Sequence, residues 1–207
     1  MASEHIYKQY DSDLEAIRAK VLEMGTLVEE QTSNAIQSLL ETDVKLAEKV
    51  IKKDEQINDL EVLIDEEASL LIAKRSPAAG DLRNIMMMLK IITDLERMGD
   101  EAAKIARSTT RIFEDNRMSK SKFNEIKGMA KAVQEMIKTA LNSFARLDLT
   151  DTIDILEKDK QVDDDYRSTM RELLTFMLED PRTISMSLES MFIAKSLERI
   201  GDHAVNI

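Results

Sequence analysis

The strongest constraint on the fold is that the second half of the chain repeats the first in an ordered series of landmarks. The segment KKDEQINDL at 52–60 is matched by EKDKQVDDD at 157–165, and ERMGD at 96–100 is matched by ERIGD at 198–202. Between them lie the two prolines of the chain, one in each half. Three matches in the same order, offset by 102 to 105 positions, indicate an internal duplication. We therefore expect two similar units, residues 1–116 and 117–207.

Apolar residues in both halves recur at helical spacing, which predicts three helices in each unit. The composition also favours helix, with only five Gly and two Pro. Short connections place successive helices antiparallel. The expected fold class is all-α, a tandem repeat of two antiparallel three-helix bundles, with the last helix shorter than its counterpart in the first bundle. The expected helices run through residues 14–39, 50–71 and 82–92, and through 126–144, 155–177 and 184–197.

Two connections in the first unit have recognisable turn chemistry. Between the first two helices, Thr42 or Asp43 offers a side-chain oxygen to cap the helix that follows. Pro77 is expected to stop the second helix, and Gly80 and Asp81 to provide the turn and the cap of the third.

Composition excludes several classes of function. The absence of Cys excludes disulfides and thiolate metal sites, and it is typical of a reducing compartment such as the cytoplasm. A formal net charge of -11 repels nucleic acid and anionic lipid, so we expect no nucleic-acid partner. No apolar run approaches the ~20 residues that a membrane span needs. Any membrane role is therefore expected to run through a protein partner, without direct insertion.

The duplicated ERMGD and ERIGD segments place two acids on one helical face. Residues four apart differ by only ~40° around the helix axis, so Glu96 and Asp100 share a face, as do Glu198 and Asp202. The apolar stripe of residues 82–92 extends to 96 and 100, which predicts that these acids point inward. Gly99 inside the helix costs up to ~1 kcal/mol relative to Ala, so something is expected to approach that backbone closely.

Further acids are expected to face them from the neighbouring helices. Reflecting the chain across each hairpin turn sets the ERMGD segment opposite residues 56–60, and the ERIGD segment opposite residues 162–166. Each unit thereby gathers acids from two helices. The candidate metal ligands are Asp54, Asn58, Asp59, Glu96 and Asp100 in the first unit, and Asp159, Asp163, Glu198 and Asp202 in the second.

Gathered carboxylates cost several kcal/mol each when partly desolvated and unpaired, so they must protonate, find cations or bind a metal. Oxygen-only ligands favour a hard cation, iron(III), manganese, magnesium or calcium, over copper, and the spacing alone leaves the metal, zinc included, undetermined. The competing interpretation is a set of ordinary interhelical ion pairs, since Arg97 and Arg199 follow the glutamates directly. Retention of the acids in two diverged halves favours metal.

An enzyme is not predicted. A carboxylate-bridged redox enzyme of the ferritin-like kind needs Glu with His three residues later, whereas His203 follows Glu198 by five residues and lies ~140° off its face. His203 is therefore expected at the surface or at an edge of the bundle. No glycine-rich phosphate loop occurs. Met86 is expected to fill the core, and Met87 to lie at a partner or homodimer interface.

Four segments, DLERMGDEAAKIAR, SLERIGDHAVNI, AAGDLRNIMMMLKIITDLER and FMLEDPRTIS, resemble the PhoU family of phosphate-transport accessory proteins over nearly the whole chain. The resemblance implies tandem three-helix bundles whose E(D)xxxD motifs hold multinuclear metal clusters on the bundle surface. That motif maps to Glu96 and Asp100, to Glu198 and Asp202, and to Asp159 and Asp163. Asp54 departs from it, because Asn58 follows where a second acid is expected.

The resemblance also implies a function. It suggests a cytoplasmic negative regulator of the phosphate-starvation response, which associates peripherally with the inner membrane through its partners. Those partners would be the ATPase subunit of the high-affinity phosphate transporter and a membrane sensor histidine kinase. The alternatives are a carboxylate-bridged redox metalloenzyme and a helical interaction protein without metal.

Overall fold

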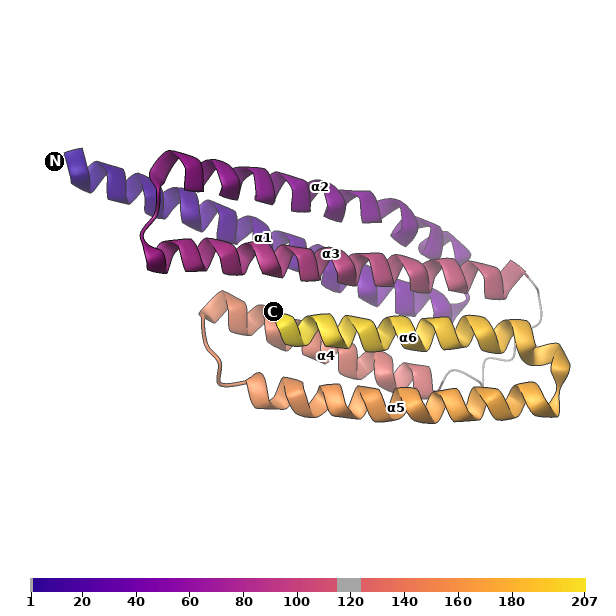
Figure 1. Ribbon diagram of the computed structural model, residues 1–207. Helices are drawn as coiled ribbons and strands as arrows, with labels where there is room; N and C mark the ends of the chain where they lie inside the picture. Colours follow the sequence, from indigo (N-terminus) through magenta and orange to yellow (C-terminus); the bar gives the residue numbers. More distant parts are fainter. Residues whose placement is uncertain (1, 115–123) are drawn as a thin grey trace.

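The computed structural model describes residues 2–114 and 124–207, and Figure 1 shows them as two stacked bundles of helices. The predicted all-α tandem repeat is confirmed, and the described residues contain no strand. The predicted boundary between the units, at residues 116 and 117, lies outside the described residues. The helices are α1 (Ala2–Glu41), α2 (Val44–Arg75), α3 (Ala79–Glu114), α4 (Asn124–Arg146), α5 (Thr152–Glu179) and α6 (Ile184–Asn206), with a 3-10 turn η2 (Pro181–Thr183) before α6.

The six helices form two layers. In Figure 1, α2, α3, α6 and α5 lie side by side in the nearer layer, with α1 and α4 behind them. Helices α3 and α6 are the innermost pair of the nearer layer and run antiparallel, so that the two bundles meet along them.

The connections follow their local chemistry, with one correction. Asp43 caps α2 by accepting a hydrogen bond from the Leu46 N–H at 3.0 Å, as predicted. Gly80 and Asp81 do not form the turn before α3, because that helix already begins at Ala79. The preceding residue Ser76 is left-handed, at φ 45°, and completes the chain reversal early. Asp81 instead lies in the first turn of α3, where its carboxylate interacts favourably with the positive end of the helix dipole.

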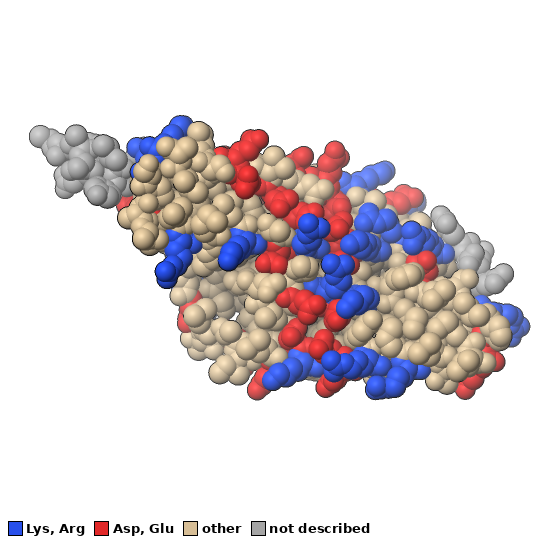
Figure 2. Space-filling model, viewed as in Figure 1, with Lys and Arg blue, Asp and Glu red and all other residues tan. Residues whose placement is uncertain are grey.

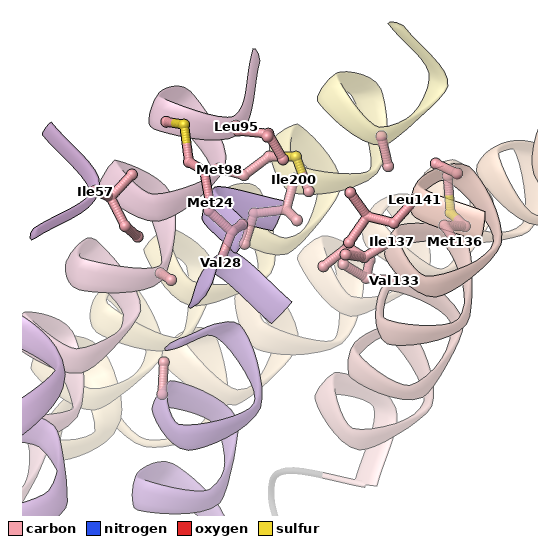
Figure 3. Close-up of a cluster of buried hydrophobic side chains, with 14 of the residues drawn as sticks. Met24, Val28, Ile57, Leu95, Met98, Val133, Met136, Ile137, Leu141 and Ile200 are labelled. Carbon is pink, nitrogen blue, oxygen red and sulfur yellow. The ribbon is translucent and has the colours of Figure 1, made fainter. Parts of the chain in front are cut away.

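The hydrophobic core is continuous between the two bundles. Buried side chains from both halves belong to one cluster (Figure 3). A Cβ at Gly25 of α1 would overlap the side chain of Leu141 of α4, so glycine there lets the two rear helices pack closely. The bundles are therefore held together by a shared core. The labelled members are Met24, Val28, Ile57, Leu95, Met98, Val133, Met136, Ile137, Leu141 and Ile200.

The buried face of α3 is wider than the predicted stripe and is rotated from it. Met86 is 46% exposed and Leu82 36%, so the prediction that Met86 fills the core is wrong. Met88 and Leu95 are buried instead. This shift arises because α3 packs against α1, α2 and α6 at once, which buries an arc that no single heptad stripe describes.

Candidate metal-binding carboxylate sets

Two sets of carboxylates lie on the face of the molecule formed by α2, α3, α6 and α5. Figure 2 shows acidic side chains gathered in a band across the middle of this face, interspersed with Lys and Arg. Both sets join acids from two neighbouring helices of one bundle. The first carboxylate set comprises Asp54 and Glu61 of α2 with Glu96 and Asp100 of α3; the second comprises Asp159 and Asp163 of α5 with Glu198 and Asp202 of α6.

Members of the first set interact electrostatically across the α2–α3 contact. Burial raises the pKa of Asp54, and the nearby charge of Asp100 raises it further. Burial also raises the pKa of Glu96, against the opposing charge of Arg97, while Glu61 and the two aspartates reinforce the rise. The predicted approach of Asp54 to Glu96 and Asp100 is therefore confirmed.

The second set repeats this arrangement between α5 and α6. Burial raises the pKa of Asp159, and the charges of Asp163 and Glu198 add to it. Burial likewise raises the pKa of Asp202, with Asp159 as the next cause. Because the pKa rises in both halves, the protein holds like charges close enough to disfavour ionisation twice.

A glycine lies beside the α2 or α5 aspartate in each set. A Cβ on Gly99 would stand 2.8 Å from Ile57 Cδ1 and 3.5 Å from Asp54 Oδ1, so the predicted close approach to this backbone is confirmed. A Cβ on Gly201 would stand 3.8 Å from Asp159 Oδ1. At Gly99 the missing side chain leaves room for Ile57, whereas at both glycines the facing aspartate oxygen lies at an ordinary contact distance.

The acids lie at the edge of the core and do not replace core residues, contrary to the prediction that they point inward. The side chains of Glu96 and Glu198 are 18% and 13% exposed, and Asp202 is exposed. Leu95 and Met98, which flank Glu96 in sequence, fill the core with no exposed surface. At this edge a carboxylate keeps some hydration while still losing enough to raise its pKa.

One acid of the first set was not predicted. Asn58 and Asp59 are exposed on α2, and their role as metal ligands stays a prediction. The unpredicted acid is Glu61. Its position in the apolar stripe of α2, seven residues after Asp54, is the signal that could have identified it. Asn58 corresponds to Asp163 of the second bundle but carries no charge. With Glu61, the first set nevertheless contains four acids, as the second set does.

Built-in cations pair with several of these acids. Lys104 Nζ lies 3.2 Å from Asp100 Oδ2, Arg97 Nε lies 3.4 Å from Glu96 Oε2, and Lys195 Nζ lies 2.6 Å from Glu198 Oε2. Within residues 2–114 and 124–207, no three carboxylate or imidazole side chains are already arranged around one point to hold an ion. The donor set fits a hard cation by its chemistry, because every donor atom is a carboxylate oxygen, but ligation would require these side chains to turn toward one another.

A third group of charges lies between the bundles, where α3 meets α6. The carboxylate of Glu101, 3% exposed as a residue, accepts a hydrogen bond from Ser196 Oγ at 2.8 Å and pairs with Arg199 Nη1 at 2.7 Å. His203 Nδ1 lies 2.8 Å from Asp94 Oδ1, and its side chain is only 19% exposed. His203 therefore lies at an edge, within the predicted surface or edge position, because the packing of α6 on α3 covers most of its side chain.

None of the helices within the described residues combines the length and apolar character needed to cross a lipid bilayer.

Comparison with known proteins identifies the family. The PhoU domain model matches residues 21–109 and 126–207. The chain is 44% identical over 203 residues to the phosphate-specific transport system accessory protein PhoU homolog of Pseudomonas putida, covering 98% of this chain and 79% of that protein. It is 40% identical over 205 residues to the Escherichia coli accessory protein PhoU, covering 99% and 84%.

Two solved structures support the same family assignment. The crystal structure of PhoU from Pseudomonas aeruginosa superposes with a TM-score of 0.91 at 43% identity, covering 95% of this chain and 94% of that one. The phosphate transport system regulatory protein PhoU from Streptococcus pneumoniae gives a TM-score of 0.86 at 29% identity, covering 95% and 92%. The chain therefore belongs to the PhoU family, whose named members are accessory proteins of phosphate-specific transport systems.

Proposed function

We propose that this protein is a metal-binding regulatory adaptor of phosphate uptake, which binds a hard cation at each carboxylate set and acts through protein partners. The observation that supports it most is the repeated electrostatic crowding: Asp54 in one bundle and Asp159 in the other both have a raised pKa caused by burial and by facing acids. A bound cation would offset that crowding, and oxygen-only donors favour a hard cation. We propose iron first, with manganese, magnesium, calcium or zinc as alternatives.

The metal part of the proposal is tested by elemental analysis of protein purified without chelator. The Glu96→Gln/Glu198→Gln variant removes one acid from each set and is expected to lose bound metal. A matched control, Glu66→Gln/Glu157→Gln, removes the same charge from exposed positions on α2 and α5 and is expected to keep it. Equal metal content in wild type and both variants would reject this assignment and leave a helical interaction protein. Redox cycling with oxygen would instead favour the metalloenzyme alternative.

The regulatory part of the proposal rests on the names of the relatives, which are accessory and regulatory proteins of phosphate transport. The proposed partners are the ATPase subunit of the phosphate transporter and the membrane sensor histidine kinase, which would hold the protein at the cytoplasmic side of the inner membrane. Co-purification with either partner, together with loss of phosphate-dependent repression on deletion, would support this role. A deletion strain that still represses normally would contradict it.

A homodimer is part of the same proposal. Met87, for which a partner interface is predicted, is 37% exposed on α3, and Leu82 and Met86 extend the apolar surface around it. Sedimentation equilibrium is expected to give twice the chain mass for wild type and a weaker association for Met87→Lys. A concentration-independent monomer would remove this part of the proposal.

A further inference from the structure

The two carboxylate sets differ in their built-in cations. Lys195 of α6 contacts both oxygens of Glu198, at 2.7 and 2.6 Å, and its ammonium group also lies 5.3 Å from the centroid of the Tyr166 ring on α5. In the first set the corresponding positions carry Thr93 and Glu61. Thr93 Oγ1 donates to the backbone carbonyl of Leu89 at 3.2 Å and supplies no charge.

The cations of the first set are held less closely. Arg97 approaches Glu96 at 3.4 Å, and Lys104 approaches Asp100 at 3.2 Å while also pairing with the buried Glu101 at 3.0 Å. Arg107 stands 3.9 Å from Asp100. A charge-assisted hydrogen bond is typically 2.7–2.9 Å long, so only the pair in the second set has that geometry among these contacts.

The Tyr166 ring explains why Lys195 stays at this place. Lysine side chains lose rotamer freedom when they are fixed, and the attraction between a cation and an aromatic face offsets part of that loss. Lys195 is 47% exposed and Glu198 only 13%, and the lysine engages both oxygens of this more buried partner. A cation that binds Glu198 therefore competes with Lys195 for these oxygens.

We infer that Lys195 is a tethered counter-ion of the second carboxylate set, and that a hard cation binds there only by displacing Lys195 from Glu198. This inference rests on the proposed function, since it concerns how that set receives its cation. It makes the two sets unequal: the first set takes up the cation at lower concentration, and the second responds only when the cation is abundant enough to displace the lysine.

The chain offers a probe that reports the second set alone. It has no Trp and three Tyr, of which Tyr166 is next to Lys195 while Tyr7 and Tyr10 stand near the start of α1. Terbium(III) is a hard cation that prefers oxygen ligands, and its luminescence is excited by energy transfer from a nearby tyrosine. Titration of the full chain with terbium, excited through tyrosine, therefore measures binding at the second set. Calorimetry of the same titration measures binding at both sets.

The test compares three variants. Lys195→Gln is expected to raise the terbium affinity of the second set about fivefold, as expected for the loss of one partly exposed ion pair. Lys195→Arg keeps the charge and is expected to bind like wild type. Lys160→Gln removes the same charge from an exposed position next to Asp159 and is expected to change the affinity less than Lys195→Gln does. Circular dichroism confirms that each variant keeps its helices.

Tyr166→Phe identifies the source of the signal. It keeps an aromatic ring under Lys195, so calorimetry is expected to show unchanged binding while the luminescence disappears. Luminescence that survives Tyr166→Phe would overturn the assignment of the signal to the second set, and with it the inference.

The outcomes separate the inference from the proposed function. Equal affinities for Lys195→Gln and Lys160→Gln, with terbium bound in both, would overturn the role of Lys195 and leave the metal sites standing. Neither heat nor luminescence in wild type and all variants would overturn both.

Discussion

Glu101 of α3 and Arg199 of α6 form an ion pair between the two bundles, with Glu101 Oε1 2.7 Å from Arg199 Nη1. Lys104 approaches the same oxygen at 3.0 Å, and Ser196 donates to the other at 2.8 Å. The Glu101 side chain is 4% exposed, whereas both cations are more than 40% exposed. A single buried carboxylate thus has partners from both halves of the duplicated chain.

Replacing Glu101 is expected to be more destabilising than replacing its arginine partner. Glu101→Ala removes the acceptor and leaves Ser196 without its hydrogen-bond partner at a buried contact, at a cost of about 2–3 kcal/mol. Arg199→Ala leaves Glu101 paired with Lys104 and is expected to cost about 1 kcal/mol. Urea unfolding followed by circular dichroism measures both. Glu55→Ala, at an exposed position of α2, is the control and should stay within about 0.5 kcal/mol of wild type.

The two glycines of the repeated motif are expected to respond oppositely to alanine. A Cβ on Gly99 would stand 2.8 Å from Ile57 Cδ1, so Gly99→Ala forces the buried isoleucine to move and should lose about 1 kcal/mol despite the better helix propensity. A Cβ on Gly201 meets Met136 Cε at an ordinary 3.5 Å, so Gly201→Ala should gain about 0.5–1 kcal/mol. Thermal unfolding of the two variants checks the difference in sign.

The comparison of the two glycine variants contains its own control. Both substitutions occur inside a helix at equivalent positions of the repeat, so helix propensity contributes equally to each. A loss of stability in Gly201→Ala as large as that in Gly99→Ala would show that the neighbouring isoleucine and methionine do not account for the difference.

The duplication, six helices and their antiparallel order were predictable from the sequence because apolar spacing and proline positions are local signals. The hairpin geometry alone predicted that Asp54 lies opposite Asp100. The predicted burial of the acids and the predicted buried stripe of α3 were wrong. A periodicity analysis treats each helix as having one buried stripe, whereas α3 contacts three other helices.

The seam between α3 and α6 was not predictable for a different reason. Glu101 and Asp94 are charged residues of the kind usually found at the surface, and nothing in the sequence says which helix of one bundle packs on the other. Once the packing is known, the repeat relates the two contacts: at the offset of 102, Glu101 corresponds to His203 and Asp94 to Ser196. The contacts Glu101–Ser196 and Asp94–His203 are therefore equivalent under the repeat.

Stability is expected to rise as the pH falls from 7 toward about 5. A carboxyl group whose pKa is raised in the folded state binds protons that the unfolded chain does not, so lowering the pH through the raised pKa favours the folded state. The gain is complete near the ordinary carboxyl pKa of about 4. Glu30 acts in the opposite sense, because the hydrogen bond from Lys53 lowers its pKa. Its contribution to the stability of the folded state is lost only when the pH falls below the ordinary carboxyl pKa. The groups that carry the gain are Asp54, Glu96, Asp159 and Asp202.

The measurement is the midpoint of urea unfolding at a series of pH values between 7 and 5, in buffers that contain a chelator. Asp54→Asn/Asp159→Asn removes one raised group and one repelling charge from each set, so it should flatten the dependence and stabilise the protein at pH 7. A wild-type midpoint that falls steadily on acidification from pH 7 would contradict the assignment of the raised groups.

A hard divalent cation is expected to stabilise the protein at pH 7 and to do so less at pH 5. Binding to the folded state alone adds RT ln(1 + [L]/Kd), about 2.7 kcal/mol when the free cation is at 100 times its Kd. Protons compete for the same oxygens, and the raised pKa of Asp54 and Asp159 brings that competition closer to neutral pH. Thermal unfolding with and without manganese at the two pH values measures the effect.

Two double variants decide whether the carboxylate sets carry this stabilisation. Asp54→Asn/Asp159→Asn should abolish most of the manganese effect at pH 7, because each set loses the acid that faces the duplicated motif. Asp65→Asn/Asp154→Asn removes the same charge from exposed positions of α2 and α5 and should respond to manganese as wild type does. An equal reduction in both would mean that manganese acts through the overall negative charge of the protein, since screening depends on net charge and not on which acids are grouped.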